Sequence, residues 1–74
     1  MEPPLTEQAV IQLNGAPFTV AAGLPITGLL ALHGMAEVPV LVEHNGVALF
    51  PREYRSVPLA AGDQVEIIRV VAGG

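Results

Sequence analysis

Two Asn-Gly dipeptides, at 14–15 and 45–46, constrain the fold of this chain more than any other feature of its sequence. Asn-Gly between alternating apolar residues is the strongest local signal for a β-hairpin, because both positions of the tight turn need a positive φ angle. The strands expected on either side of the two turns cover 9–13, 17–21, 38–44 and 47–50. The sequence therefore predicts two antiparallel hairpins, separated by a segment of different character.

The segment between the hairpins has the apolar spacing of a helix. Its stripe, at positions i, i+3, i+4 and i+7, consists of Ile26, Leu29, Leu30 and His33. Pro25 suits the first helical turn, where its missing N–H costs nothing, and Gly34 can end the helix with a positive φ. We expect His33 to be partly buried and hydrogen-bonded within the core stripe, and not to bind a ligand.

Two further segments complete the chain. Residues 51–54 are typical of one 3₁₀ turn, with Tyr54 folding back onto the core, and the β-branched run over 64–71 predicts a last strand. The order is strand, strand, helix, strand, strand, strand. Because a single helix can cover only one face of one sheet, the sequence predicts a two-layer α+β domain whose other sheet face is partly open to water.

The composition narrows the possible functions. Seven carboxylates against three arginines give a formal net charge of −4 with no basic patch, so nucleic acid is not an expected partner. No apolar run approaches the ~20 residues that span a bilayer, and the first residues lack the pattern of a signal peptide. We therefore expect a cytoplasmic protein with no membrane partner.

The sequence shows no arrangement that would carry catalysis. Cysteine is absent, which excludes a thiol nucleophile, disulfide bonds and a thiolate metal site. No serine, histidine and acid are grouped as a nucleophile and its base, and no cluster of side chains suits a metal ion. We expect no catalytic residue, no metal and no cofactor, and hence a protein that is not an enzyme.

The C-terminal residues are the most distinctive functional feature. Ala72, Gly73 and Gly74 follow the last predicted strand and have no side chain larger than a methyl group. Glycine lets a backbone enter a narrow space without steric cost, so the α-carboxylate of Gly74 would be at the end of a narrow, flexible segment. The expected parts of the chain are a disordered lead-in over 1–8, a folded domain over 9–71 and a flexible tail over 72–74.

Alternation along the last strand predicts a docking surface. Val65 and Ile67 should face the helix, so Ile68 and Val70 should face outward, next to Leu41 from the third strand. Three branched apolar side chains together on the open face of a small acidic domain form a contiguous patch, and such patches often mark interfaces. Because the patch leads to the tail, a partner that binds it would direct the tail into its own active site.

These motifs, in this order, resemble the ubiquitin-like β-grasp fold and, within it, the sulfur carrier proteins of thiamine biosynthesis, the ThiS family. The segments that carry the resemblance are Leu13-Asn14-Gly15, Ala22-Gly23, Leu29-Leu30, Val42-Glu43-His44-Asn45-Gly46, Phe50-Pro51-Arg52-Glu53, Gly62-Asp63-Gln64-Val65-Glu66-Ile67 and Gly73-Gly74. The resemblance covers nearly all of residues 10–74 and implies a mixed sheet covered on one face by one helix. His33 and His44 depart from it, because aliphatic residues are expected at both positions.

The resemblance also implies a chemistry centred on Gly74. Its carboxylate would be adenylated by a ThiF-like enzyme, converted into a thiocarboxylate and used as the sulfur donor for thiazole formation by a ThiG-like thiazole synthase. Three alternatives stay open. The chain could be a MoaD-like small subunit of molybdopterin synthase, although 68–71 lacks the Phe-Pro-Pro-like stretch usual there. It could also be a ubiquitin-like modifier conjugated to lysines of other proteins, or a binding module with an incidental tail.

Overall fold

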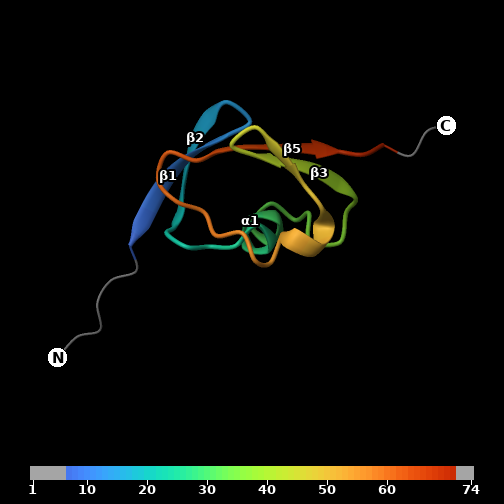
Figure 1. Cartoon of the computed structure of the whole chain (residues 1–74), viewed down its shortest axis with the longest axis horizontal. Helices are drawn as coiled ribbons and strands as arrows, with labels where there is room; N and C mark the ends of the chain where they lie inside the picture. Colours follow the sequence, from blue (N-terminus) through green and yellow to red (C-terminus); the bar gives the residue numbers. More distant parts are fainter. Residues whose placement is uncertain (1–6, 72–74) are drawn as a thin grey trace.

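The computed structural model describes residues 7–71, in which five strands form one sheet in the order β2-β1-β5-β3-β4. The elements are β1 (Gln8–Leu13), β2 (Ala16–Ala21), α1 (Ile26–Leu32), β3 (Val40–His44), β4 (Val47–Leu49), the 3₁₀ turn η1 (Pro51–Glu53) and β5 (Gln64–Arg69). The helix lies across one face of the sheet, as Figure 1 shows. The predicted α+β architecture, a mixed sheet covered on one face by one helix, is confirmed.

The two Asn-Gly pairs form the two hairpins of the sheet. Asn14 and Asn45 have φ angles of 49° and 50°, and each is followed by a glycine with a φ of 83°. Positive φ at both central positions is the type I′ geometry, whose twist matches that of paired strands. β1 pairs antiparallel with β2, and β3 pairs antiparallel with β4. β5 then lies between β1, to which it runs parallel, and β3, to which it runs antiparallel.

Helix α1 is bounded by the two residues that its sequence favours as ends. Pro25 is the N-cap and has extended backbone angles (φ −72°, ψ 161°). It therefore lies one residue before the first helical turn, to which the sequence prediction assigns it. At the other end, the Met35 amide donates to the Leu30 carbonyl at 2.8 Å, and the Gly34 amide donates to the Ala31 carbonyl at 3.1 Å. Together with a φ of 69° at Gly34, these bonds form the Schellman motif expected of a glycine there.

The prediction for His33 is wrong. This residue is exposed, and not partly buried and hydrogen-bonded in the core. It is the C-cap of α1, where the backbone has already left the helical conformation (φ −104°). Its ring packs against Phe18 of β2, with ring centroids 4.9 Å apart. The apolar stripe therefore ends at Leu30, because position i+7 of so short a helix falls beyond its last turn.

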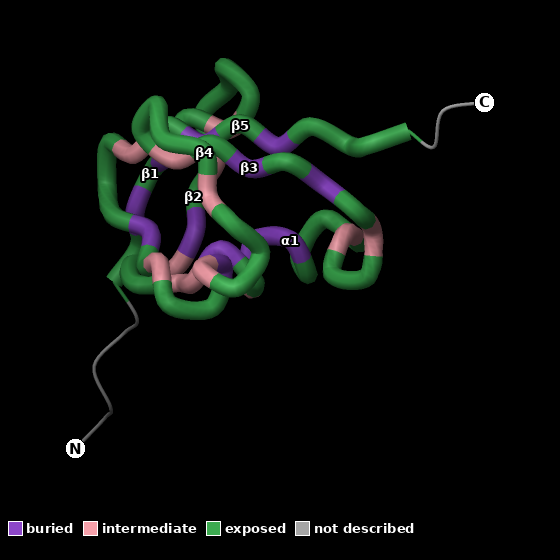
Figure 2. The backbone as a smooth tube through the Cα atoms, turned by 45° about the vertical axis from the view of Figure 1, so that its right-hand side comes forward, coloured by how far each residue is buried: buried purple, intermediate pink, exposed green. Residues whose placement is uncertain are grey.

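The core lies between α1 and the inner face of the sheet. Buried and exposed residues alternate along β1, β3 and β5, as the sequence predicts (Figure 2). The largest fully buried side chains are Ile11, Ile26, Leu29, Val42, Leu59 and Val65. Tyr54 is 7% exposed and folds back onto this core, and its hydroxyl donates to the Val40 carbonyl at 3.3 Å. Burial of the phenol raises the pKa of Tyr54.

The strand boundaries differ from the predicted ones mainly beside Pro39. β3 begins at Val40, later than predicted, because Pro39 has no N–H to donate to a ladder. β5 ends at Arg69 and not at residue 71. The Pro39 carbonyl nevertheless accepts a hydrogen bond from the Val70 amide at 3.1 Å, so the chain stays tied to the sheet for one residue past β5.

The ends of the predicted domain are described in part. Gln8, which the sequence analysis assigns to the lead-in, belongs to β1 and pairs with Ala21 of β2. The rest of the lead-in, up to residue 6, and the tail over 72–74 lie outside the described residues. No helix among residues 7–71 is long and apolar enough to cross a membrane.

Candidate functional site

The central strand of the sheet leads directly to the tail. β5 runs between β1 and β3, and the described chain continues to Val71, on the side of the molecule away from the start of β1 (Figure 1). The predicted reactive group, the carboxylate of Gly74, lies outside the described residues, as do Gly73 and Ala72. Their roles stay predictions. The structure describes the platform from which they extend.

An exposed group of branched side chains, which we call the apolar patch, lies beside this exit and consists of Leu41, Ile68 and Val70. Leu41 and Ile68 are direct cross-strand partners on β3 and β5. They are 60% and 49% exposed, and Val70 is 46% exposed. Leu41 and Ile68 are thus exposed and paired across the two strands, as alternation predicts, and Val70 is exposed one residue past β5. The role of the three residues in docking stays a prediction.

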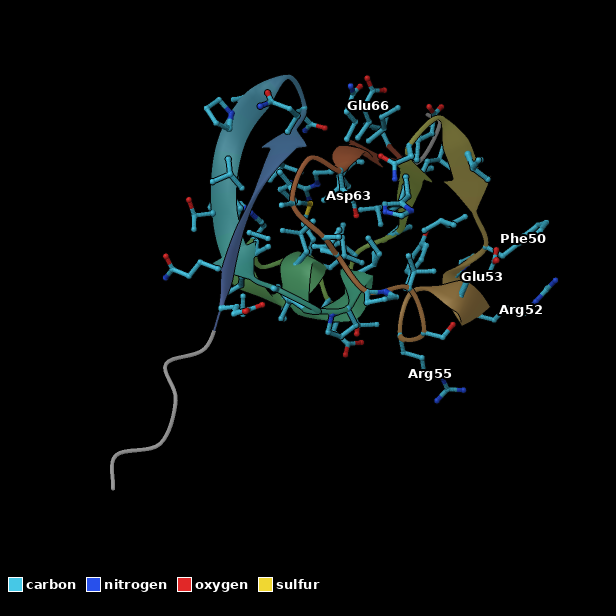
Figure 3. The ribbon with its side chains drawn as sticks, turned by 60° about the vertical axis from the view of Figure 1, so that its left-hand side comes forward. Phe50, Arg52, Glu53, Arg55, Asp63 and Glu66 are labelled. Carbon is cyan, nitrogen blue, oxygen red and sulfur yellow. The ribbon has the colours of Figure 1, made fainter. Side chains whose placement is uncertain are left out.

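Two carboxylates adjoin the apolar patch on the same face. Glu43 and Glu66 are direct partners in the register of β3 and β5, one outward-facing position along from Leu41 and Ile68. Figure 3 shows Glu66 projecting from the side of the sheet away from α1. Within residues 7–71, the recorded ion pair is between His44 and Asp63 and involves neither glutamate. The outer face thus combines exposed apolar surface with negative charge that no described cation neutralises.

The first hairpin turn also contacts β5. Asn14 Oδ1 accepts a hydrogen bond from the Ile67 amide at 2.8 Å, and Asn14 Nδ2 donates to the Ile67 carbonyl at 3.3 Å. The local sequence around Asn14 predicts only its place in the turn. Its side chain could not be placed from local pattern, because Ile67 lies 53 residues further along the chain.

The second hairpin turn contacts the other end of β5. Asn45 Oδ1 accepts from the Gln64 amide at 2.8 Å, and Asn45 Nδ2 donates to Asp63 Oδ1 at 3.2 Å. Asp63 Oδ2 lies 2.8 Å from His44 Nε2 and accepts from the Ala60 amide at 2.9 Å. Partial desolvation raises the pKa of Asp63, but the hydrogen bonds from His44, Ala60 and Asn45 outweigh it and leave the pKa below its usual value. His44, where an aliphatic residue is expected, is thus accommodated by a carboxylate partner.

The turn η1 presents an aromatic ring and a cation to solvent. Phe50 is 59% exposed, and the Arg52 guanidinium carbon lies 4.6 Å from the centre of its ring. Glu53 Oε1 accepts from the Phe50 amide at 2.8 Å, which closes the turn locally. In Figure 3, Phe50 and Arg52 project outward from the same corner. The sequence predicts this turn but no function for it.

The helix side of the molecule carries a cavity of about 470 Å³. Mainly apolar side chains from α1, the loop after it and η1 line it, together with Thr27 and Tyr54. Within residues 7–71, no three His, Cys, Asp or Glu side chains come together as possible metal ligands. The predicted docking residues Leu41, Ile68 and Val70 do not line this cavity.

A mixed sheet of this order, with two tight hairpins and one helix across a single face, defines a protein of the ubiquitin-like β-grasp class. Comparison with known proteins narrows the class. The model of the ThiS family matches residues 8–74, and the chain belongs to that family of sulfur carriers.

Individual relatives agree with the family and differ in length. The crystal structure of thiamine biosynthesis protein ThiS from Geobacter metallireducens has a TM-score of 0.75 and 34% identity, with 88% of this chain and 99% of that one covered. A thiazole synthase from Magnetococcus marinus is 38% identical over 64 residues, which are 86% of this chain but 20% of that protein. A protein named ycf40 from Porphyra purpurea is 34% identical over 64 residues, 86% of this chain and 90% of that protein. The chain thus resembles two proteins over nearly their whole length, and about a fifth of a third, longer protein.

Proposed function

We propose that this chain carries sulfur for thiazole formation in thiamine biosynthesis, as a thiocarboxylate on Gly74. The observation that carries the proposal is the match to the ThiS family, because it extends through residue 74 and so includes Gly73-Gly74. The similar solved structure is described as a thiamine biosynthesis protein, which supports the same pathway. The direct course of β5 from the core to the C-terminal residues suits a carrier whose end is handled by other proteins.

The chemistry begins with activation, because a carboxylate is a poor electrophile. One carboxylate oxygen of Gly74 attacks the α-phosphorus of ATP, the bond to the bridging oxygen breaks and pyrophosphate leaves. The terminal sulfur of a persulfide then attacks the carbonyl carbon of the acyl-adenylate and expels AMP. A thiol cleaves the S–S bond of the resulting acyl disulfide, takes the other sulfur as a mixed disulfide and leaves the thiocarboxylate.

In this scheme the chain is a substrate and not an enzyme. Phosphate charge in such reactions is balanced by metal ions and cationic groups. The outer face beside the exit of β5 instead presents Glu43 and Glu66, which would repel a nucleotide. The ATP site therefore belongs to a ThiF-like adenylating enzyme, and the need for ATP makes the cytoplasm the compartment that we propose.

The outer face is the proposed contact with that enzyme. The apolar patch is continuous with the exit of β5, so a partner that covers Leu41, Ile68 and Val70 receives the tail beside its own active site. Glu43 and Glu66 would attract a basic rim on the partner, which mainly raises the association rate.

A ThiG-like thiazole synthase is the proposed acceptor of the sulfur. The similarity to a fifth of a protein named thiazole synthase supports this partner, because a segment like this chain occurs there in one polypeptide with further sequence. Linking two modules raises the effective concentration of one near the other, which benefits parts that act in succession.

Mass spectrometry of the protein purified from its own cells tests the proposal. We expect a fraction whose C-terminal peptide is heavier by the replacement of one oxygen with sulfur. With ATP and the adenylating enzyme, the wild type should release pyrophosphate, whereas a folded Gly74→Trp variant should not. Isopeptide bonds between Gly74 and lysines of other proteins, without any thiocarboxylate, would identify a modifier instead. Full function in cells after deletion of Gly74 would make the tail incidental.

A further inference from the structure

The side chain of Asn14 replaces backbone that β1 no longer provides. The parallel pairing of β1 with β5 ends at Leu13 and Val65, where β1 turns away into β2, although β5 continues. In a longer parallel ladder, the amide and carbonyl of Ile67 would bond to the backbone of β1. Here Asn14 Oδ1 accepts from the Ile67 amide at 2.8 Å, and Asn14 Nδ2 donates to the Ile67 carbonyl at 3.3 Å. One side-chain amide thus satisfies both groups.

The other edge of β5 pairs with β3 from Val65 to the end of the strand. The register with β3 continues to Val40 and Arg69, and the Val70 amide adds a hydrogen bond to the Pro39 carbonyl at 3.1 Å. On the edge of β5 that faces β1, the two bonds between Asn14 and Ile67 are the hydrogen bonds recorded beyond Val65 within residues 7–71. A strand held along one edge can swing about that edge, and a bond on the opposite edge removes this freedom.

We propose that Asn14 is a positioning residue for sulfur transfer, which fixes the direction in which the chain leaves β5 and so places the C-terminal glycine in the partner's active site. The inference rests on the proposed function. Among residues 7–71, Val70 is the last one with a recorded hydrogen bond to the sheet, and it also belongs to the apolar patch, so its orientation links docking to the tail. A displacement of about 1 Å at reacting atoms can cost on the order of a hundredfold in rate.

Asparagine suits this role by its backbone and by its side chain. Its φ of 49° lies in the left-handed region, which asparagine tolerates better than most residues. Its amide offers an acceptor and donors together, as the amide and carbonyl of Ile67 require. Aspartate keeps the acceptor and loses the donor, and glycine keeps the backbone conformation and loses both.

The second Asn-Gly turn supplies a matched control. Asn45 has a φ of 50°, and its side chain accepts from the Gln64 amide at 2.8 Å, at the start of β5 and away from the exit. Asn14→Gly and Asn45→Gly therefore delete the same atoms from equivalent turns. They differ in which end of β5 is released.

The experiment compares the full-length wild type with Asn14→Gly, Asn14→Asp and Asn45→Gly. Without a partner, amide hydrogen exchange at Ile67 and ¹⁵N relaxation at Val70 report the hold on β5. With ATP and the adenylating enzyme, pyrophosphate release gives kcat and KM.

For Asn14→Gly we expect faster exchange at Ile67 and a lower order parameter at Val70. We also expect kcat to be reduced about tenfold or more, with KM within about twofold of the wild-type value because the apolar patch is intact. Asn14→Asp should lie between, and Asn45→Gly should keep kcat within about twofold of the wild type.

Three outcomes would overturn the inference. Equal reductions in kcat for Asn14→Gly and Asn45→Gly would show a general loss of stability. Unchanged exchange at Ile67 in Asn14→Gly would remove the structural basis, whatever the enzyme assay gives. The wild type could also release no pyrophosphate while Asn14→Gly shows the expected faster exchange at Ile67. That result would contradict both the proposed function and the positioning role, and would leave only the structural contact between Asn14 and β5 supported.

Discussion

Glu43 and Glu66 lie directly opposite each other on β3 and β5, at exposed positions that alternate with the buried residues of the inner face. Like charges at directly opposed positions destabilise a sheet, and no described cation pairs with either of them. The same two strands place Leu41 and Ile68 at the next outward-facing positions. We interpret this arrangement as part of an interface. The repulsion between the two carboxylates lowers the stability of the free protein, and the same charges attract a cationic partner.

Replacing one of the two carboxylates should change stability and association in opposite directions. Glu66→Gln relieves the repulsion, so we expect the free energy of unfolding to increase by a few tenths of a kcal/mol, up to about 1 kcal/mol. Association with the adenylating enzyme should become slower and less dependent on salt. Urea denaturation and stopped-flow measurements at two ionic strengths check both effects.

The control for this charge change is Glu37→Gln. Glu37 is exposed in the loop between α1 and β3, so the variant has the same net charge with the outer face intact. An equal loss of association rate in both variants would assign the effect to net charge alone and contradict a specific role of Glu66.

The apolar patch leads to a prediction about affinity. Ile68→Glu should weaken binding to the adenylating enzyme at least tenfold, about 1.4 kcal/mol, because it places a charge where the partner would bury a side chain. Ile68 is 49% exposed, so the domain should stay folded. Val10→Glu makes a comparable change at a residue that is 50% exposed on β1, away from the patch, and should bind normally. Unchanged affinity of a folded Ile68→Glu protein in a calorimetric titration would place docking elsewhere.

The parts of the fold that follow from local chemistry could be predicted from the sequence. Asn14 and Asn45 set both hairpins, because each, with its glycine, meets the positive φ that a type I′ turn demands. Gly34 ends α1 for a similar reason. The alternation in β5 placed Ile68 on the outer face, because a strand has a strict two-residue period once one face is buried.

The parts that depend on distant neighbours could not be predicted in this way. Asn14 reaches Ile67 across 53 residues, and His44 meets Asp63 across 19 residues, so no local pattern contains either contact. The error at His33 has a different cause. The helical period and the end at Gly34 were both predicted correctly, but this end makes His33 the C-cap, where the backbone has left the helical conformation and the side chain no longer follows the buried stripe.

The glycine inside α1 leads to a prediction about stability. Alanine is favoured over glycine in a helix by up to about 1 kcal/mol. A Cβ atom at position 28, however, would lie 2.5 Å from Leu24 Cδ1 and 2.9 Å from Leu24 Cγ, so the Leu24 side chain, which packs against the core, would have to shift. We therefore expect Gly28→Ala to lower the free energy of unfolding instead of raising it, as measured by urea denaturation.

A double-mutant cycle with Leu24→Ala separates the two effects. In that background the clash is gone, so Gly28→Ala should become stabilising by about the helix propensity difference, several tenths of a kcal/mol. A stabilising effect of Gly28→Ala in the wild-type background would show that the Leu24 side chain moves aside at little cost.

The contact between Asp63 and its neighbours predicts how stability depends on pH. Hydrogen bonds from His44, Ala60 and Asn45 hold the pKa of Asp63 below its usual value of 3.8, despite partial desolvation. The folded state therefore binds fewer protons here than the unfolded state, so the ionised carboxylate stabilises the fold at pH values above 3.8. This contribution should be lost as the pH falls below 3.8 and through the lower pKa of the folded state.

Asp63→Asn cannot ionise, so its stability relative to the wild type should be lowest near neutral pH and recover in acid. Urea midpoints of both proteins, measured from neutral pH down to about pH 2, give this difference directly, because the other carboxylates titrate in both. A difference that stays constant over the whole range would contradict the assignment of the acid-sensitive contribution to Asp63.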